Sequence, residues 1–167
     1  MNEGNILMLM LTSMIMMVAI ILSFMSSRWS CPVAYAAMIC GDMSGWVHIE
    51  GSTYLFWAIA TLICLGLDLM LPKEIARTRA GLYHICGGTL AGTAVGLCFN
   101  NSAGIICGAA AGAFFGALAF ANTRAGRPMH FPSYKFFNYL GAKGLPAIVA
   151  MSMIGLVVVQ LISPAQV

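Results

Sequence analysis

The sequence predicts an all-helical integral membrane protein with about six transmembrane helices. Of its 167 residues, 60% are apolar and 8% are charged, and its mean hydropathy is +0.90. A soluble domain carries roughly 25% charged residues, so this composition is typical of a chain buried in lipid. Two apolar segments also place glycine at every fourth position, on either side of a short polar tip at residues 100–102. We therefore expect a single polytopic membrane domain over residues 1–167 that contains a close-packed pair of helices.

Six apolar stretches approach the roughly 20 residues that a membrane-spanning helix needs. They cover residues 6–24, 31–47, 53–71, 81–99, 103–121 and 145–162. The second is the shortest, with Pro32 near its start and Asp42 near its end, so it either crosses the membrane or forms a re-entrant element. Pro72 ends the third stretch, and Pro146 lies in the first turn of the sixth, where a missing N–H is tolerated.

The charged residues between these stretches agree with six crossings. If all six cross, every Lys and Arg falls on one side of the membrane, which the positive-inside rule identifies as the cytoplasmic side. That side holds Arg28, Lys73, Arg77, Arg79, Arg124, Arg127, Lys135 and Lys143. The other side holds Glu3, Asp42, Glu50 and the tip at residues 100–102. We expect a bacterial inner-membrane protein with both termini on the non-cytoplasmic side. Residues 1–5 contain no basic residue, which agrees with that orientation. A cleaved signal peptide begins with a positively charged region, so none is expected here.

Residues 81–121 are predicted to form a glycine-rich helical hairpin. Its ladder of small residues consists of Gly88, Gly92, Gly96, Gly104, Gly108, Gly112 and Gly116. A step of four residues turns a helix by about 400°, so the glycine face drifts by about 40° per step and a partner helix must cross obliquely. We expect the glycines to pack the two helices on each other, with contact to another copy or to a solute as alternatives.

Residues 122–144 form the longest polar connection, which we place in the cytoplasm or at the membrane interface. Its second half, residues 133–143, mixes aromatic rings with lysine. This mixture is typical of an interfacial helix at headgroup level, or of the first turns of the last spanning helix.

Two ionisable residues in the apolar stretches are the candidates for a polar, ion or proton site, because charge inside a membrane usually marks function. Asp68 lies four residues before Pro72, near the cytoplasmic interface, with Arg77 or Arg79 as its expected partner. It either forms a structural ion pair or binds a cation or proton. His84 shares the face of the first glycines and points into their groove, where it either donates to a carbonyl or binds a ligand.

Other polar and sulfur-containing residues point to packing. Thr89 and Thr93 are expected to donate hydrogen bonds between helices, and with Thr61 and Gln160 they are the few groups that a solute would contact. The six cysteines form no Cys-x-x-Cys or Cys-His cluster, so neither a metal site nor extensive disulfide bonding is expected. The first stretch contains five methionines, which spread around the helix and favour adaptable packing over copper binding: Met8, Met10, Met14, Met16 and Met17.

The order of several motifs resembles a family of small bacterial membrane proteins, the domain of unknown function 456. The matching motifs are Leu67-Asp68-Leu69-Met70-Leu71-Pro72, the basic connection at residues 73–79, residues 94–97 and the glycine-rich segment at residues 104–116. The resemblance covers roughly residues 30–160. Three features depart from the family: the tip at residues 100–102 lacks a proline, Ala117 replaces an acidic residue, and Cys31-Pro32 replaces a longer turn. The resemblance implies a membrane protein without established activity and transfers no catalytic residues.

Two classes of function fit these features. In the first, the chain is a non-catalytic accessory or scaffold subunit that binds other membrane subunits, or another copy of itself, within the lipid bilayer. In the second, it is a small oligomeric transporter or channel. A transport pathway would run near Asp68 and His84, but the scarcity of polar groups within the apolar stretches favours the scaffold. We expect no enzyme, because no nucleophile, base and orienting residue come together in the sequence. Neither a cofactor, a metal nor a nucleic-acid partner is indicated.

Overall fold

The computed structural model describes residues 3–25, 29–70, 81–127 and 131–162. Within these ranges the chain folds into helices and contains no strand, which confirms the predicted all-helical fold. The helices are α1 (Glu3–Phe24), α2 (Ser30–Met43), α3 (Gly51–Met70), α5 (Leu82–Leu97), α6 (Ser102–Ala121), α7 (Tyr134–Tyr139), a π-helical turn η2 (Leu140–Gly144) and α8 (Leu145–Ile162). Each of the six predicted stretches therefore contains one helix, and the helix ends differ by only a few residues.

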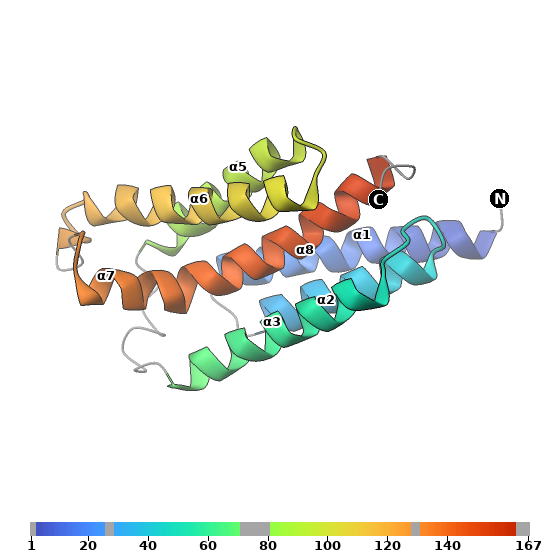
Figure 1. The fold of residues 1–167 in the computed structure, drawn as a ribbon, viewed down its shortest axis with the longest axis horizontal. Coiled ribbons are helices and arrows are strands. Elements are labelled where there is room, and N and C mark those ends of the chain that lie inside the picture. Colours follow the sequence, from blue (N-terminus) through green and yellow to red (C-terminus); the bar gives the residue numbers. More distant parts are fainter. Residues whose placement is uncertain (1–2, 26–28, 71–80, 128–130, 163–167) are drawn as a thin grey trace.

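The helices run up and down along one long axis, so consecutive long helices point in opposite directions, and α7 and η2 continue into α8 (Figure 1). The N-terminus of α1, the C-terminus of α8, the connection from α2 to α3 and the tip between α5 and α6 all lie at one end of this bundle. We call it the outer end, after the sequence prediction that places the tip at residues 100–102 on the non-cytoplasmic side. The connection from α6 to α7 lies at the opposite end. This arrangement follows from short connections between neighbouring helices, which force an antiparallel course.

Within the described part of the chain, three helices are long and apolar enough to cross a membrane. They cover Asn5–Phe24, Ser102–Ala121 and Tyr134–Ile162, of 20, 20 and 29 residues. The apolar part of α3, Gly51–Leu67, is shorter than these. The two shortest of the main helices are α2 with 14 residues and α5 with 16. At 1.5 Å per residue they measure about 21 and 24 Å, less than the roughly 30 Å of a hydrocarbon core.

The longest helix forms because α7, η2 and α8 join without a break. Pro146 has no N–H to give to a carbonyl one turn earlier, and the chain widens into the π-helical turn η2 just before it. The sequence placed residues 133–143 either along the interface or at the start of the last helix. From Tyr134 on, this segment forms α7 and η2 and continues directly into α8. Over 29 residues this helix is about 44 Å long, so it exceeds the hydrocarbon thickness.

The last helix also forms the centre of the bundle. α8 packs against α1, α2, α3, α5 and α6, and more than half of its residues are buried. One core cluster lies between α1, α2, α3 and α8 and contains Met38, Trp57 and Met153. A second, aromatic cluster lies around the start of α5, with Phe120, Phe136 and Tyr139. Small residues such as Ala150 and Gly155 let the neighbouring helices approach α8 closely.

Candidate functional site: the glycine hairpin and the outer pocket

The glycines of α5 and α6 face each other along the whole hairpin. A Cβ atom on Gly96 would lie 2.6 Å from the carbonyl oxygen of Gly104, and one on Gly92 would lie 2.9 Å from the Cα of Gly112. Real carbon–carbon contacts begin near 3.5 Å, so neither position has room for a side chain. The remaining ladder positions follow the same pairing, with Gly88 against Gly112 and Gly116. The groove expected between these helices is therefore filled by backbone.

The two ionisable candidates lie in different surroundings. His84 is exposed, and its ring centroid lies 5.9 Å from that of Phe120. Its backbone carbonyl meets Gly116 of α6, and its side chain is exposed, so the imidazole is not enclosed between the glycines. The side chain of Asp68 and the residues Arg77 and Arg79 fall outside the described part of the structure. A polar site formed by Asp68 and His84 stays a prediction.

The threonines bond within their own helices, so the predicted hydrogen bonds between helices were wrong. Thr89 donates to the carbonyl of Ile85 at 2.7 Å, and Thr93 donates to the carbonyl of Thr89 at 2.8 Å. Thr61 likewise donates to Trp57 at 2.8 Å. A threonine hydroxyl in a helix always has the carbonyl four residues earlier within reach, and this local partner satisfies it.

The sulfur-containing residues divide between core and surface. Met16 is buried, whereas Met10, Met14 and Met17 are between 61% and 67% exposed. The three exposed methionines lie on one side of α1, which the sequence did not predict. All six cysteines are free thiols. Among the described residues, no group of three His, Cys, Asp or Glu side chains is placed to hold a metal ion.

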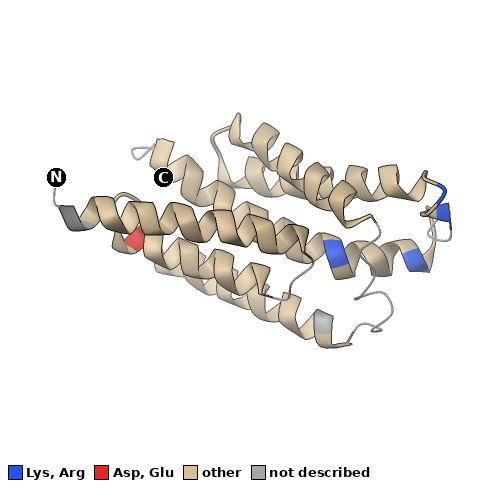
Figure 2. Cartoon of the chain, turned by 180° about the vertical axis from the view of Figure 1, so that it is seen from behind, with Lys and Arg blue, Asp and Glu red and all other residues tan. Residues whose placement is uncertain are grey.

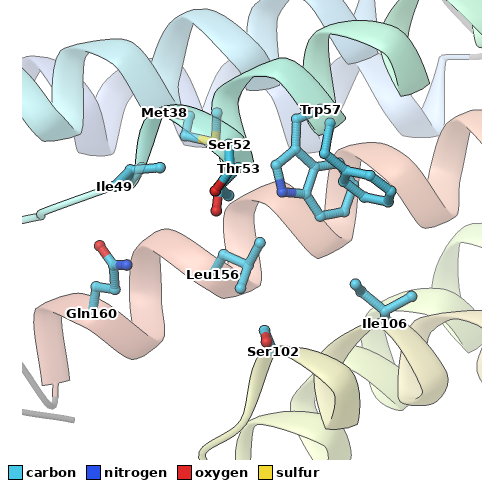
Figure 3. Close-up of a pocket in the computed structure, with 10 residues that line it drawn as sticks. Met38, Ile49, Ser52, Thr53, Trp57, Ser102, Ile106, Leu156 and Gln160 are labelled. Carbon is cyan, nitrogen blue, oxygen red and sulfur yellow. The ribbon is translucent and has the colours of Figure 1, made fainter. Parts of the chain in front are cut away.

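A pocket of about 310 Å³ lies at the outer end of the bundle (Figure 3). It is formed by α3 and α6 where both pack against α8, with α2 and the following connection closing one side. Gln160 and Leu156 of α8 face Ser52, Thr53 and Trp57 of α3 across the pocket. The lining residues are Met38, Ile49, Ser52, Thr53, Phe56, Trp57, Ser102, Ile106, Leu156 and Gln160.

One fully buried polar atom of a residue that lines this pocket has no hydrogen-bond partner among the described residues. The side-chain oxygen Oε1 of Gln160 is buried, and no described residue donates a hydrogen bond to it. By contrast, the hydroxyl of Ser52 donates to Glu50 at 3.3 Å, and that of Ser102 to Asn101 at 3.4 Å. A buried oxygen without a donor is unfavourable, and this one has almost no accessible surface, so a molecule in the pocket does not reach it in this conformation. The sequence marked Gln160 as a group that a solute would contact, but no pattern predicted the pocket around it.

Basic and acidic residues lie toward opposite ends of the bundle (Figure 2). The described Lys and Arg residues, Arg124, Arg127, Lys135 and Lys143, lie in the half opposite to the outer end. Asp42 lies one residue before the end of α2 and Glu50 directly precedes α3, so both described acidic side chains lie at the outer end. No charged side chain of the described residues lines the pocket.

No family model, curated protein or solved structure matches this chain. The resemblance to the domain of unknown function 456 therefore stays a prediction, and the function must be argued from the geometry alone.

Proposed function

We propose that this chain is a multi-pass protein of the bacterial inner membrane, crossing six times, and that it acts as a non-catalytic scaffold subunit of a membrane complex. The observation that carries the proposal is the separation of charge along an up-and-down bundle of apolar helices (Figure 2). Lys and Arg concentrate at the cytoplasmic ends of membrane helices, so the basic end is the cytoplasmic end. The outer end, with both termini, then faces away from the cytoplasm.

The outward face of α1 supports the role of a subunit. Leu7, Met10, Met14, Met17 and Ile21 are all more than half exposed. Their spacing alternates between three and four residues, which is the pattern of a seam that packs along one partner helix. Methionine is long and adaptable, and it is frequent at surfaces that bind other proteins. We therefore assign this methionine face, defined by these five residues, to a partner helix in the membrane.

The topology is tested by the accessibility of single cysteines to a membrane-impermeant maleimide. In a background where Cys40, Cys98 and Cys107 are alanine, Asn101→Cys is expected to be labelled only from the outer side. Lys135→Cys is expected to be labelled only after the cytoplasmic side is exposed. Labelling of both from the same side would refute six crossings.

The subunit role is tested by photo-crosslinking from the methionine face. A photoreactive amino acid at position 14 is expected to form one discrete protein adduct in native membranes, identified by mass spectrometry. The same amino acid at position 62, on the exposed face of α3, is the matched control and is expected to form lipid adducts only. Equal lipid adducts from both positions would contradict the proposal.

A small transporter or channel is the second candidate, and the pocket at the outer end of the bundle is the observation that favours it. Native mass spectrometry separates the two roles. A homo-oligomer without other chains would support the transporter and lead to flux assays in liposomes, whereas a stable assembly with unrelated chains supports the scaffold.

A further inference from the structure

We propose that the pocket between α3, α6 and α8 binds an uncharged, membrane-dissolved molecule through a carbonyl oxygen. The ester group of a bilayer lipid and the carbonyl group of a free lipophile, such as a ketone, share this chemistry, and the experiment separates the two sources. The inference rests on the membrane embedding proposed above, but it does not depend on the scaffold role. Three features of the pocket carry it: the indole N–H of Trp57, the amide nitrogen of Gln160 and the uncharged, mainly apolar lining.

The indole N–H of Trp57 is a buried hydrogen-bond donor. The Trp57 side chain is only 3% exposed, and no described residue accepts a hydrogen bond from its Nε1 atom. Unlike the side-chain oxygen of Gln160, this nitrogen is not fully enclosed, so it borders the free volume that Trp57 lines. Figure 3 shows it on the edge of the ring toward Thr53 and Leu156. Leaving a buried donor unpaired is unfavourable, so a bound group that accepts this hydrogen bond is favoured.

The Gln160 amide adds a second donor, from α8. In Figure 3 its nitrogen lies nearer the cavity than its oxygen, and no described residue accepts a hydrogen bond from it. Indole and amide N–H groups only donate, so both require an acceptor. A carbonyl oxygen has two lone pairs and no hydrogen, so it satisfies such a donor and leaves no new donor unpaired.

The charges around the pocket favour an uncharged carrier for this carbonyl group. No charged side chain of the described residues lines the pocket. Asp42 and Glu50 lie at the same end of the bundle, and every described Lys and Arg lies in the other half. A carboxylate or a phosphate also accepts hydrogen bonds, but in these surroundings it would lose its hydration without gaining an ion pair.

Depth and size fit a group that approaches from the bilayer. Ser52 lies at the start of α3, and Trp57 is five residues further on, which places it about 8 Å deeper along the helix. Apolar side chains complete most of the lining, among them Phe56, Ile106 and Leu156. A volume of about 310 Å³ is at the small end of the 300–1,000 Å³ that ligand pockets occupy, so it holds one small lipophile or part of one lipid chain.

The proton of the Trp57 indole provides the measurement. The changes Trp29→Phe and Trp46→Phe leave Trp57 as the single tryptophan, so isotope-labelled tryptophan gives one indole N–H signal in NMR spectra. We reconstitute this variant in nanodiscs of ether-linked phosphatidylcholine, which contains no ester carbonyl, and add methyl nonyl ketone. The indole proton is expected to shift downfield in a saturable manner, because it enters a hydrogen bond to the carbonyl oxygen. Undecane has the same number of carbon atoms without the oxygen and is expected to cause no downfield shift.

The source of the carbonyl group is identified by changing the lipid. In nanodiscs of ester-linked phosphatidylcholine, a proton already shifted downfield before any addition would identify a bilayer lipid as the occupant. A proton at the position found in ether-linked lipid, which still responds to the ketone, would identify a free lipophile. If neither ester lipid nor ketone moves the proton, or if it shows nuclear Overhauser effects to water in the presence of both, the proposal is overturned.

Two variants and one control test the assigned contacts. Gln160→Leu is expected to weaken ketone binding by about three- to tenfold, because it removes one hydrogen-bond donor. Ile106→Phe is expected to abolish the saturable shift by filling the pocket. Thr61→Val changes a polar residue whose hydroxyl bonds within its own helix, so it is expected to bind like the parent. Unchanged binding in both Gln160→Leu and Ile106→Phe would place the ketone outside this pocket.

A separate indole distinguishes failure of the pocket from failure of the embedding. When Trp57→Phe is added to the other two changes, Leu62→Trp places the single indole at a position that is 67% exposed. Its N–H is expected to show nuclear Overhauser effects to the chain protons of the lipid. If it shows them to water instead, the membrane embedding is wrong. If it shows them to lipid but the Trp57 proton responds to no carbonyl compound, the pocket does not bind this class.

Discussion

Replacing Gly92 by alanine tests how closely α5 and α6 must approach. The new Cβ would press on the carbonyl oxygen of Gly108 and lie 2.9 Å from the Cα of Gly112. Because carbon–carbon contacts are favourable only from about 3.5 Å, the two helices must separate locally by about 0.6 Å or more. The neighbours are backbone atoms of a second helix, which cannot turn aside as a side chain does.

The expected loss of stability is on the order of 2 kcal/mol, within the range of about 1–3 kcal/mol for overpacking a close contact. For a chain of this size it corresponds to a decrease in the melting temperature of about 4–8 °C. Gly87→Ala is the matched control on the same helix, because nothing lies within 4 Å of its Cβ position. Alanine favours the helix over glycine by up to about 1 kcal/mol, so this control is expected to be neutral or stabilising.

Thermal unfolding in detergent provides the assay, followed by a fluorogenic maleimide that reacts with thiols as they become exposed. Cys31, Cys64 and Cys86 are buried and report the opening of the core. If Gly92→Ala and Gly87→Ala shift the melting temperature equally, close backbone approach is not what stabilises the hairpin.

The same thermal assay checks three further substitutions. Gly81 has a φ of 77°, and a Cβ atom there would collide with Phe120. Gly81→Ala is therefore expected to lower the free energy of unfolding by about 1–3 kcal/mol. Gly66→Ala is the neutral control, because nothing lies within 4 Å of its Cβ position. Phe136 is fully buried, and its ring centroid lies 6.0 Å from that of Phe114. Phe136→Ala is therefore expected to lower the free energy of unfolding by about 3–5 kcal/mol. An equal loss for Phe137→Ala, at an exposed position, would contradict this. Thr89→Val is expected to stay within about 1 kcal/mol of the parent, because its hydroxyl bonds to Ile85 of the same helix; a larger loss would mean that the hydroxyl binds a second helix.

The helices and their order were predictable because they depend on local sequence. Long apolar runs form helices, and Pro146 near the start of the last run did not hide it. The spacing of the glycines placed them on shared faces, and those faces are in contact in the structure. The direction of side chains was less predictable. Thr93 was expected to donate to another helix, but the nearer carbonyl of Thr89 accepts its hydrogen.

The outer pocket was not predictable, because its residues come from four helices and the connection after α2. No spacing in the sequence links Ser52 to Ser102 or either of them to Gln160. Their proximity depends on how far α3 and α6 spread where they pack on α8, which the volumes of buried side chains decide.

The sequence by itself determined the all-helical fold, the positions of the helices and the ends at which basic and acidic residues occur, since hydrophobicity and charge act within single segments. The tertiary structure alone decided that the His84 side chain is exposed and that Met16 turns inward while Met14 turns outward. It also decided that a side-chain oxygen of Gln160 is buried with no donor among the described residues. These features depend on contacts between residues that are distant in the chain, and such contacts are fixed only when the helices pack together.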